Sequence, residues 1–301
     1  MERSISVTVD VEDWYHIPSV TGSPFSVYGS VDEFFEKWKK RYDYLSEPTR
    51  RTLDILDEFR IRATFFVVAD VVDHYPGLVE GIVERGHEIA CHGLNHACNV
   101  DPATKKEVFS DREFRSKTKK AVGLLQGISN NEVTGYRAPS AYISGRIVDS
   151  LEEMGFMYDS SIYVNSLINK TGVKLEGVGT TPYYPKKGSL LPGGKRGFVE
   201  FPMTHWNILG FKVPTSGGPM LRFLGARVVR NGIEQSVKRG HAVFYFHPID
   251  ICYEKFPTVG KRRPFYWAIK GKRVERRLRY ILKSISGYRI RTLGEAAKDH
   301  L

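Results

Sequence analysis

The chain has 301 residues, of which 41% are hydrophobic and 26% are charged. This composition is typical of a globular protein with a substantial core, and it excludes an intrinsically disordered chain. The formal net charge of +11 comes from 45 basic and 34 acidic residues, and no stretch approaches the roughly 18 apolar residues that a membrane span requires.

The N-terminal half alternates between predicted strands and predicted helices. Residues 4–11 are predicted as a buried strand, because β-branched and apolar residues dominate them. Helical spacing of apolar residues follows at 31–44 and 48–59, then a strand at 61–68, a helix near 79–85 and a strand at 88–91. This order predicts parallel strands joined by crossover helices.

The same alternation continues toward the C-terminus with less regularity. The pattern predicts a helix at 105–127, a strand at 133–136, a helix at 144–155 and strands at 157–160, 198–202 and 242–246. Residues 165–197, rich in Gly, Lys and Pro, are expected to form an inserted loop region. Without a linker anywhere, residues 1–301 are predicted to form a single barrel-like α/β domain.

Two histidines four positions apart, His92 and His96, follow the predicted strand at 88–91. Side chains four apart on a helical turn share one face, so both imidazoles could bind one cation. The acidic cluster of residues 10–13 could add a carboxylate, and such a ligand set suits zinc with an open position for water. A pair of histidines at this spacing is weak evidence alone, and ordinary loop histidines are the alternative.

Three further polar residues stand where apolar strands end. Arg137 could fix a carboxylate by paired hydrogen bonds, and His247 could donate a proton. Asp159 could line a pocket at the same edge. Taken singly, each has a structural alternative, as a surface ion pair, a turn cap or a core histidine. Because the carboxyl ends of parallel strands meet at one edge, we expect all three near Asp10.

The sequence resembles the polysaccharide deacetylases of the NodB-homology, carbohydrate esterase family four type. Five blocks carry the resemblance in order, at residues 8–13, 86–96, 135–139, 158–161 and 244–248, and residues 62–66 resemble the family's second strand. The resemblance covers residues 4 to about 250. It implies a distorted (β/α) barrel and a divalent cation, expected to be Zn²⁺, held by one carboxylate and two histidines.

The resemblance also implies a role for each matched residue. Asp10 matches the general base that activates water, Arg137 matches the arginine that orients this base, and His247 matches the histidine acid. His92 and His96 match the two metal histidines.

Four residues are expected to bind the substrate. Asp159 falls in a block that lines the pocket of the family, and Pro139 follows Arg137 closely. Trp14 and Tyr245 could offer flat apolar faces to a sugar ring. Aromatic residues of this kind are more often part of the core or the rim of a site.

The opening motif departs from the family pattern. This chain has Asp-Val-Glu-Asp where the usual opening is Thr-Phe-Asp-Asp-Gly. Strand alternation puts Glu12 on the face of Asp10, whereas Asp13 keeps the usual residue type. We favour Asp13 as the metal carboxylate and keep Glu12 as the alternative. Gly93 stands where the family commonly has Ser or Thr, and the opening resembles a subgroup near peptidoglycan deacetylases and allantoinase-like cyclic-amide hydrolases.

The resemblance implies metal-dependent hydrolysis of an amide C–N bond, with deacetylation of an N-acetylated sugar or polysaccharide as the expected reaction. A hydrolase of a linear or cyclic amide outside any polymer would use the same residues. A catalytically inactive glycan-binding protein on the same fold is the alternative from another class.

Two features bear on location and partners. The start of the chain lacks a charged and apolar leader, and the three cysteines form no Cys-x-x-Cys pattern, so we expect a cytoplasmic protein. A basic segment at about 261–285 is predicted to be helical. It can attract anionic lipid headgroups or simply be a solvated helix face. Nucleic acid is not expected, because no nucleic-acid-binding motif accompanies the charge.

Overall fold

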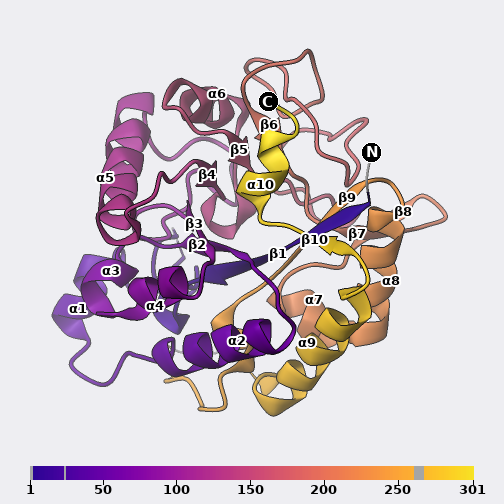
Figure 1. The fold of residues 1–301 in the computed structure, drawn as a ribbon. Helices are drawn as coiled ribbons and strands as arrows, with labels where there is room; N and C mark the ends of the chain where they lie inside the picture. Colours follow the sequence, from indigo (N-terminus) through magenta and orange to yellow (C-terminus); the bar gives the residue numbers. More distant parts are fainter. Residues whose placement is uncertain (1–2, 24, 261–267) are drawn as a thin grey trace.

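The computed structural model describes residues 3–23, 25–260 and 268–301 (Figure 1). Its central sheet consists of β1 (Ser4–Val11), β2 (Thr64–Val67), β3 (Glu88–Cys91), β4 (Gly135–Tyr136), β5 (Tyr158–Asp159), β6 (Val199–Glu200), β9 (His241–Phe246) and β10 (Arg289–Ile290). The strand order is β10-β1-β2-β3-β4-β5-β6, with β9 also paired to β1. These strand pairings are all parallel, as the alternation of elements predicts.

Helices surround the curled sheet (Figure 1). They are α1 (Val31–Lys37), α2 (Ser46–Glu58), α3 (Val71–His74), α4 (Leu78–Glu84), α5 (Asp111–Ser129), α6 (Gly145–Glu153), α7 (Gly218–Phe223), α8 (Ala226–Val237), α9 (Lys272–Ile285) and α10 (Leu293–Lys298), with short 3₁₀ turns η1 (Trp14–His16), η2 (Pro139–Ala141) and η3 (Pro248–Ile251). Local signals set their ends. For example, Ser110 and Glu113 cap the start of α5 reciprocally, and Asn130 ends it in the left-handed region.

Two helices are shorter than their apolar spacing predicts. The helix expected at 31–44 ends at Lys37, and the helix expected at 105–127 begins only at Asp111. Residues before α5 are held instead by an isolated bridge between Val100 and Glu107. Side-chain spacing alone therefore overestimates the length of a helix where caps or bridges bind the backbone groups that the helix would use.

Strand β1 separates its residues by type between the two faces of the sheet. Ile5, Val7 and Val9 belong to the large core between the sheet and the outer helices. The alternate residues are polar, and Asp10 is paired in register with Phe66, which belongs to a second apolar cluster. Because residues in register share a face, the polar face of β1 points into the curl of the sheet.

The sheet closes into a distorted (β/α) barrel, which confirms the predicted fold class. After β6 the chain runs beside β9, where the Thr204 amide donates to the Val243 carbonyl at 3.1 Å. The chain then leaves the barrel as an antiparallel hairpin of β7 (His205–Ile208) and β8 (Phe211–Pro214). One end of the barrel thus stays open at the carboxyl ends of the strands.

The opposite end of the barrel is covered by α10. The Glu88 carboxylate accepts hydrogen bonds there from Thr64 Oγ1 at 2.6 Å, from the Gly294 amide at 3.0 Å and from the Tyr158 hydroxyl at 2.9 Å. Leu293 of α10 packs into the interior apolar cluster. The last helix of the chain is therefore joined to β2, β3 and β5 at this end.

The expected loop region forms neither a helix nor a strand between residues 161 and 198, all of which the structure describes. Of the expected basic segment, residues 261–267 lie outside the described residues. In α9, Arg277 donates to the Leu221 carbonyl at 2.9 Å, and Arg279 donates to Glu275 at 2.9 Å. Within the described chain, no helix combines the length and the apolar character needed to cross a bilayer.

Candidate metal centre and active site

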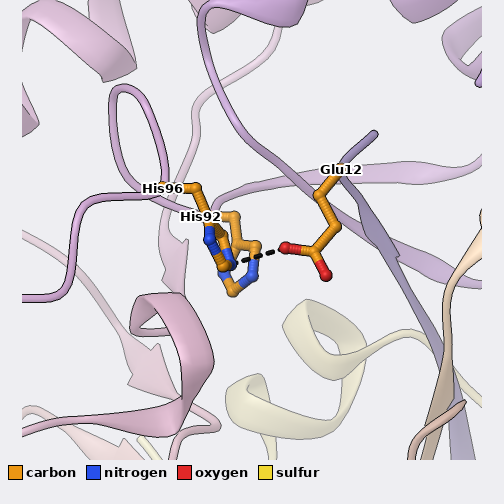
Figure 2. A group of neighbouring side chains, drawn as sticks. All are labelled: Glu12, His92 and His96. Carbon is orange, nitrogen blue, oxygen red and sulfur yellow. Dashed lines mark ion pairs between the residues drawn. The ribbon is translucent and has the colours of Figure 1, made fainter. Parts of the chain in front are cut away.

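Glu12, His92 and His96 converge at the open end of the barrel (Figure 2). Glu12 follows β1, and His92 follows β3, so the parallel sheet brings them to one edge. One ligand atom of each residue lies within 4.8 Å of the others, and His96 Nε2 is 2.5 Å from Glu12 Oε2. All three residues are buried.

Both histidines are oriented by backbone carbonyl groups. His92 Nδ1 lies 2.8 Å from the Arg137 carbonyl, and His96 Nδ1 lies 2.8 Å from the His16 carbonyl. A carbonyl oxygen only accepts, so each Nδ1 carries the proton and each Nε2 keeps a lone pair. Burial lowers the pKa of His92 to about 4, which keeps that ring neutral.

The environment of Glu12 fits a cation. Its Oε2 atom is buried without hydrogen-bond geometry to any described residue, although His96 Nε2 is adjacent. Burial opposes the charge of Glu12, but the neighbouring His96 and His247 hold the pKa of its carboxyl well below the usual range. A carboxylate oxygen and two imidazole lone pairs directed at one point form the donor set of a divalent cation such as zinc.

Asp13 lies apart from these ligands, so the preference for it is corrected in favour of Glu12. Its Oδ1 accepts from the Trp14 amide at 2.6 Å, and its Oδ2 accepts from the Tyr44 amide at 2.8 Å and the Tyr75 hydroxyl at 2.7 Å. Burial raises the pKa of Asp13 to about 7. Asp13 caps η1 and fixes the turn that follows Glu12.

The loop that carries the histidines has a strained backbone. His96 adopts a φ of 56°, which is uncommon for a residue with a side chain, and its ring is held by the His16 carbonyl. Gly93 has a φ of 81°, and a Cβ atom there would lie 3.1 Å from Pro139 Cγ. Glycine therefore replaces the usual Ser or Thr. Pro139 packs on this loop and does not line the cavity, contrary to its expected role as a substrate contact.

Asp10 and Arg137 form a buried ion pair beside the ligands. Arg137 Nη1 is 2.5 Å from Asp10 Oδ1 and 2.9 Å from Thr8 Oγ1, and its other nitrogens donate to Ser160. Arg137 is only 1% exposed, and its guanidinium stacks on Phe66. The free oxygen of Asp10 lies 4.0 Å from His92 Nε2, so it could take a proton from a molecule bound there.

His247 lies opposite this pair. Its Nε2 is 4.0 Å from Asp10 Oδ2 and 3.3 Å from Glu12 Oε1, while its Nδ1 is 3.2 Å from Asp250 Oδ2. Burial opposes the charge of the imidazole, but Asp250 and Glu12 raise the pKa of His247 to about 9. The two carboxylates therefore favour the protonated form of the ring. Asp250 is itself paired with Arg222.

A cavity of about 250 Å³ opens between these groups. Tyr245 lines it, as expected, and so does Lys170, which the sequence analysis did not identify. Lys170 comes from the irregular segment and donates to the Ser140 carbonyl at 2.8 Å, and burial lowers its pKa to about 8. Asp250 was also missed, although its position three residues after His247, beyond a proline, was a capping signal.

Asp159 does not reach the cavity, contrary to expectation. It accepts from the Ser161 amide at 3.0 Å and from Ser161 Oγ at 2.6 Å, beneath Arg137. Burial raises the pKa of Asp159, and burial together with the adjacent Asp159 raises the pKa of Glu200. Asp159 thus fixes Ser161, whose hydroxyl accepts from the Ala138 amide at 2.7 Å, directly after Arg137 in the chain.

Trp14 is a core residue and not a substrate contact. It is fully buried, packs edge-on against Phe34 and Trp38, and donates from Nε1 to the Tyr42 carbonyl at 2.7 Å. It does not line the cavity. The aromatic residues of α1 thus anchor the segment that follows Glu12.

We expect Trp14→Ala to lower the free energy of unfolding by about 3–5 kcal/mol, because a large buried ring leaves a cavity. Urea unfolding followed by circular dichroism measures this loss. At temperatures where the variant is folded, its KM should match that of the wild type. A raised KM with an unchanged free energy of unfolding would instead support Trp14 as a residue that contacts the substrate.

Two family models match the chain in separate halves. A model described as polysaccharide deacetylase matches residues 36–158, and a model described as a domain of unknown function matches residues 171–294.

Several known proteins are similar to this chain. It is 29% identical over 116 residues to a peptidoglycan deacetylase-like protein of Gibberella zeae, across 37% of this chain and 32% of that protein. It is 27% identical over 111 residues to a peptidoglycan-N-acetylglucosamine deacetylase of Bacillus cereus, across 36% of this chain and 47% of that protein. Each match thus spans less than half of the curated relative.

The fold is also similar to that of a solved structure. A protein of Mycobacterium smegmatis assigned as a polysaccharide deacetylase superimposes with a TM-score of 0.65 at 18% identity. The superposition covers 99% of this chain and 89% of that chain. The likeness extends over both matched halves.

Proposed function

Because the chain belongs to the polysaccharide deacetylase family, of the NodB-homology, carbohydrate esterase family four type, we propose that it removes acetyl groups from an N-acetylated sugar. The substrate is a glycan or a fragment of one, and the products are acetate and a free amine. One observation carries the proposal. Six residues that are far apart in the sequence surround one buried cavity: Asp10, Glu12, His92, His96, Arg137 and His247.

We propose that Glu12, His92 and His96 hold a divalent cation, Zn²⁺ being the best match to this donor set. When bound, such a cation supplies a Lewis acid that polarises the acetyl carbonyl and acidifies a water molecule. The orphaned Oε2 atom of Glu12 and the two carbonyl-oriented imidazoles support this role.

Asp10 acts as the general base in this proposal. Its carboxylate takes the proton of the attacking water, and Arg137 orients this carboxylate through the contact of 2.5 Å. Since Arg137 is also bonded to Ser160 and Thr8, it cannot turn away from Asp10. The base is therefore oriented before the substrate arrives.

His247 acts as the general acid. Its protonated ring can give a proton to the nitrogen that leaves. Asp250 holds the ring through Nδ1, so Nε2 faces the cavity. The carboxylate of Asp250 stabilises the charged form of His247 before the proton is transferred.

A second candidate substrate is a small linear or cyclic amide. A cavity of about 250 Å³ is below the usual range of roughly 300–1,000 Å³ for ligand pockets. It suits one ring-sized group, whether that group ends a glycan or stands alone. The same residues would carry out the hydrolysis in either case.

We expect the purified chain to release acetate from N-acetylated oligosaccharides, with about one zinc per chain determined on the same sample. Acetate is measured on a panel that also contains small acyclic and cyclic amides. Faster turnover of the small amides would favour the second candidate. Glycan binding without acetate release, in a zinc-loaded sample, would contradict catalysis and favour an inactive glycan-binding protein.

We also propose a cytoplasmic location. The three cysteines, Cys91, Cys98 and Cys252, are buried and unpaired, which supports a reducing compartment. Burial raises the pKa of the Cys91 thiol to about 12, so it behaves as a small core residue.

A further inference from the structure

Five large apolar side chains are exposed together around the β7-β8 hairpin, which lies at the periphery of the molecule beside α8 (Figure 1). They are Leu209, 103% exposed, Leu167, 78%, Ile168, 55%, Phe211, 44%, and Ile208, 41%. We call these five residues the apolar tip. Hydrogen bonds hold its two segments together, from the Ser166 amide to the Lys212 carbonyl at 3.0 Å and from the Lys212 amide to Ser166 Oγ at 2.8 Å.

The turn of the hairpin is unfavourable for the residue that occupies it. Ile208 pairs with Phe211, so the loop consists of Leu209 and Gly210, with φ angles of 51° and 90°. A two-residue turn with both φ angles positive favours Asn, Asp or Gly at its first position. Leu209 is both strained and fully exposed. Neither a strained backbone nor an exposed leucine stabilises an isolated monomer. We therefore infer that the Leu209 side chain contacts something outside the monomer.

The two segments that carry the apolar tip contain basic residues and no acidic ones. The sequence contains neither Asp nor Glu between residues 160 and 175 or between residues 201 and 233. Lys212 lies on β8, and Arg239 donates to Gln235, whose side chain also bonds the Asn207 amide of β7 at 2.8 Å. A protruding apolar turn flanked by cations complements a surface that is anionic outside and apolar beneath.

We propose that the apolar tip inserts into the interfacial region of an anionic lipid bilayer and docks the protein on the membrane. The apolar tip consists of five side chains, whereas a stable interface with another protein uses roughly 20–30 residues from each side. Lipid headgroups surround such a protrusion without a matching pocket, so the exposed leucines can enter the acyl boundary. The proposal concerns location and does not depend on catalysis.

The test uses the full chain and vesicles of two compositions, phosphatidylcholine alone and phosphatidylcholine with phosphatidylglycerol. Sedimentation should show binding to the anionic vesicles. Leu209→Asn should weaken this binding about tenfold, a change that corresponds to about 1.4 kcal/mol. Asn tolerates the left-handed backbone, so the thermal midpoint should not fall. Val108→Thr is the matched control, since Val108 is 49% exposed at another place and its replacement should leave binding unchanged.

Several outcomes would overturn the proposal. One is a wild-type chain that stays in the supernatant with both vesicles, and another is a Leu209→Asn variant that binds as well as the wild type. Self-association removed by Leu209→Asn would assign the apolar tip to a second copy of the chain instead. Acetate release from a soluble substrate should be the same in wild type and Leu209→Asn, so the docking and the proposed activity are tested separately.

Discussion

Asp10→Asn is expected to lower kcat/KM for acetate release by about a thousandfold, because general-base catalysis contributes about 10²–10⁴. Asparagine has the same shape and can keep a hydrogen bond from Arg137, but its amide cannot take the proton of the attacking water. A thousandfold loss corresponds to about 4 kcal/mol of transition-state stabilisation. The rate is measured on the best substrate, with the zinc content determined in parallel and expected to be unchanged.

Thr8→Val is the matched control for this variant. Thr8 lies on the same face of β1 and accepts from Arg137 Nη1 at 2.9 Å, but it faces no reacting group. Its replacement removes one hydrogen bond from the charged guanidinium, which contributes about 1.5–3 kcal/mol, but leaves the Asp10 carboxylate in place, so the loss should be about 10–100-fold and smaller than that of Asp10→Asn. If Asp10→Asn kept more than a tenth of the wild-type rate while folded, Asp10 would not be the base.

Glu12→Gln is expected to weaken zinc binding at least a hundredfold and to remove acetate release with it. Loss of an outer partner of a metal ligand costs about 10–100-fold in affinity, and loss of the ligand itself should cost more. A neutral amide also cannot balance the charge of the cation at this buried point. Titration of zinc against a competing chelator measures the affinity.

Asp13→Asn serves as the comparison, since Asp13 neighbours Glu12 in the sequence. It should keep its zinc affinity within a few fold, because its carboxylate contacts Trp14, Tyr44 and Tyr75 instead of the histidines. The Asp13→Asn variant should instead be less stable and unfold at a lower urea concentration. The reverse result, with zinc lost in Asp13→Asn and kept in Glu12→Gln, would restore Asp13 as the ligand.

The alternation of side chains along β1 predicted the position of the carboxylate better than the residue type did. Alternation along β1 placed Glu12 on the face of Asp10, which is where the structure has it. The usual residue type favoured Asp13, but the chain turns at that point and uses this carboxylate to cap η1. The backbone keeps its strand period through Glu12, so in the proposed site a glutamate two positions after Asp10 takes the place of the family's aspartate.

Other parts of the site leave little trace in the sequence. The barrel and the strand-end residues Asp10, Arg137 and His247 were predictable, because apolar strands mark where their polar successors gather. The His16 group that orients His96 is a backbone carbonyl, so no residue type in the sequence could have indicated it. Lys170 comes from a segment without periodicity, so its approach to the cavity depends on contacts that no local pattern encodes.

The first strand has consequences for how the chain is made. Its partner on one edge, β9, comes from the far end of the chain, and Ser4 contacts His241 across 237 positions. Closing so large a loop costs entropy before any pairing compensates for it, which slows folding. On the ribosome, the edge of β1 that pairs with β9 therefore stays unpaired until β9 has been synthesised. During that interval the unpaired edge is exposed to strand-to-strand aggregation.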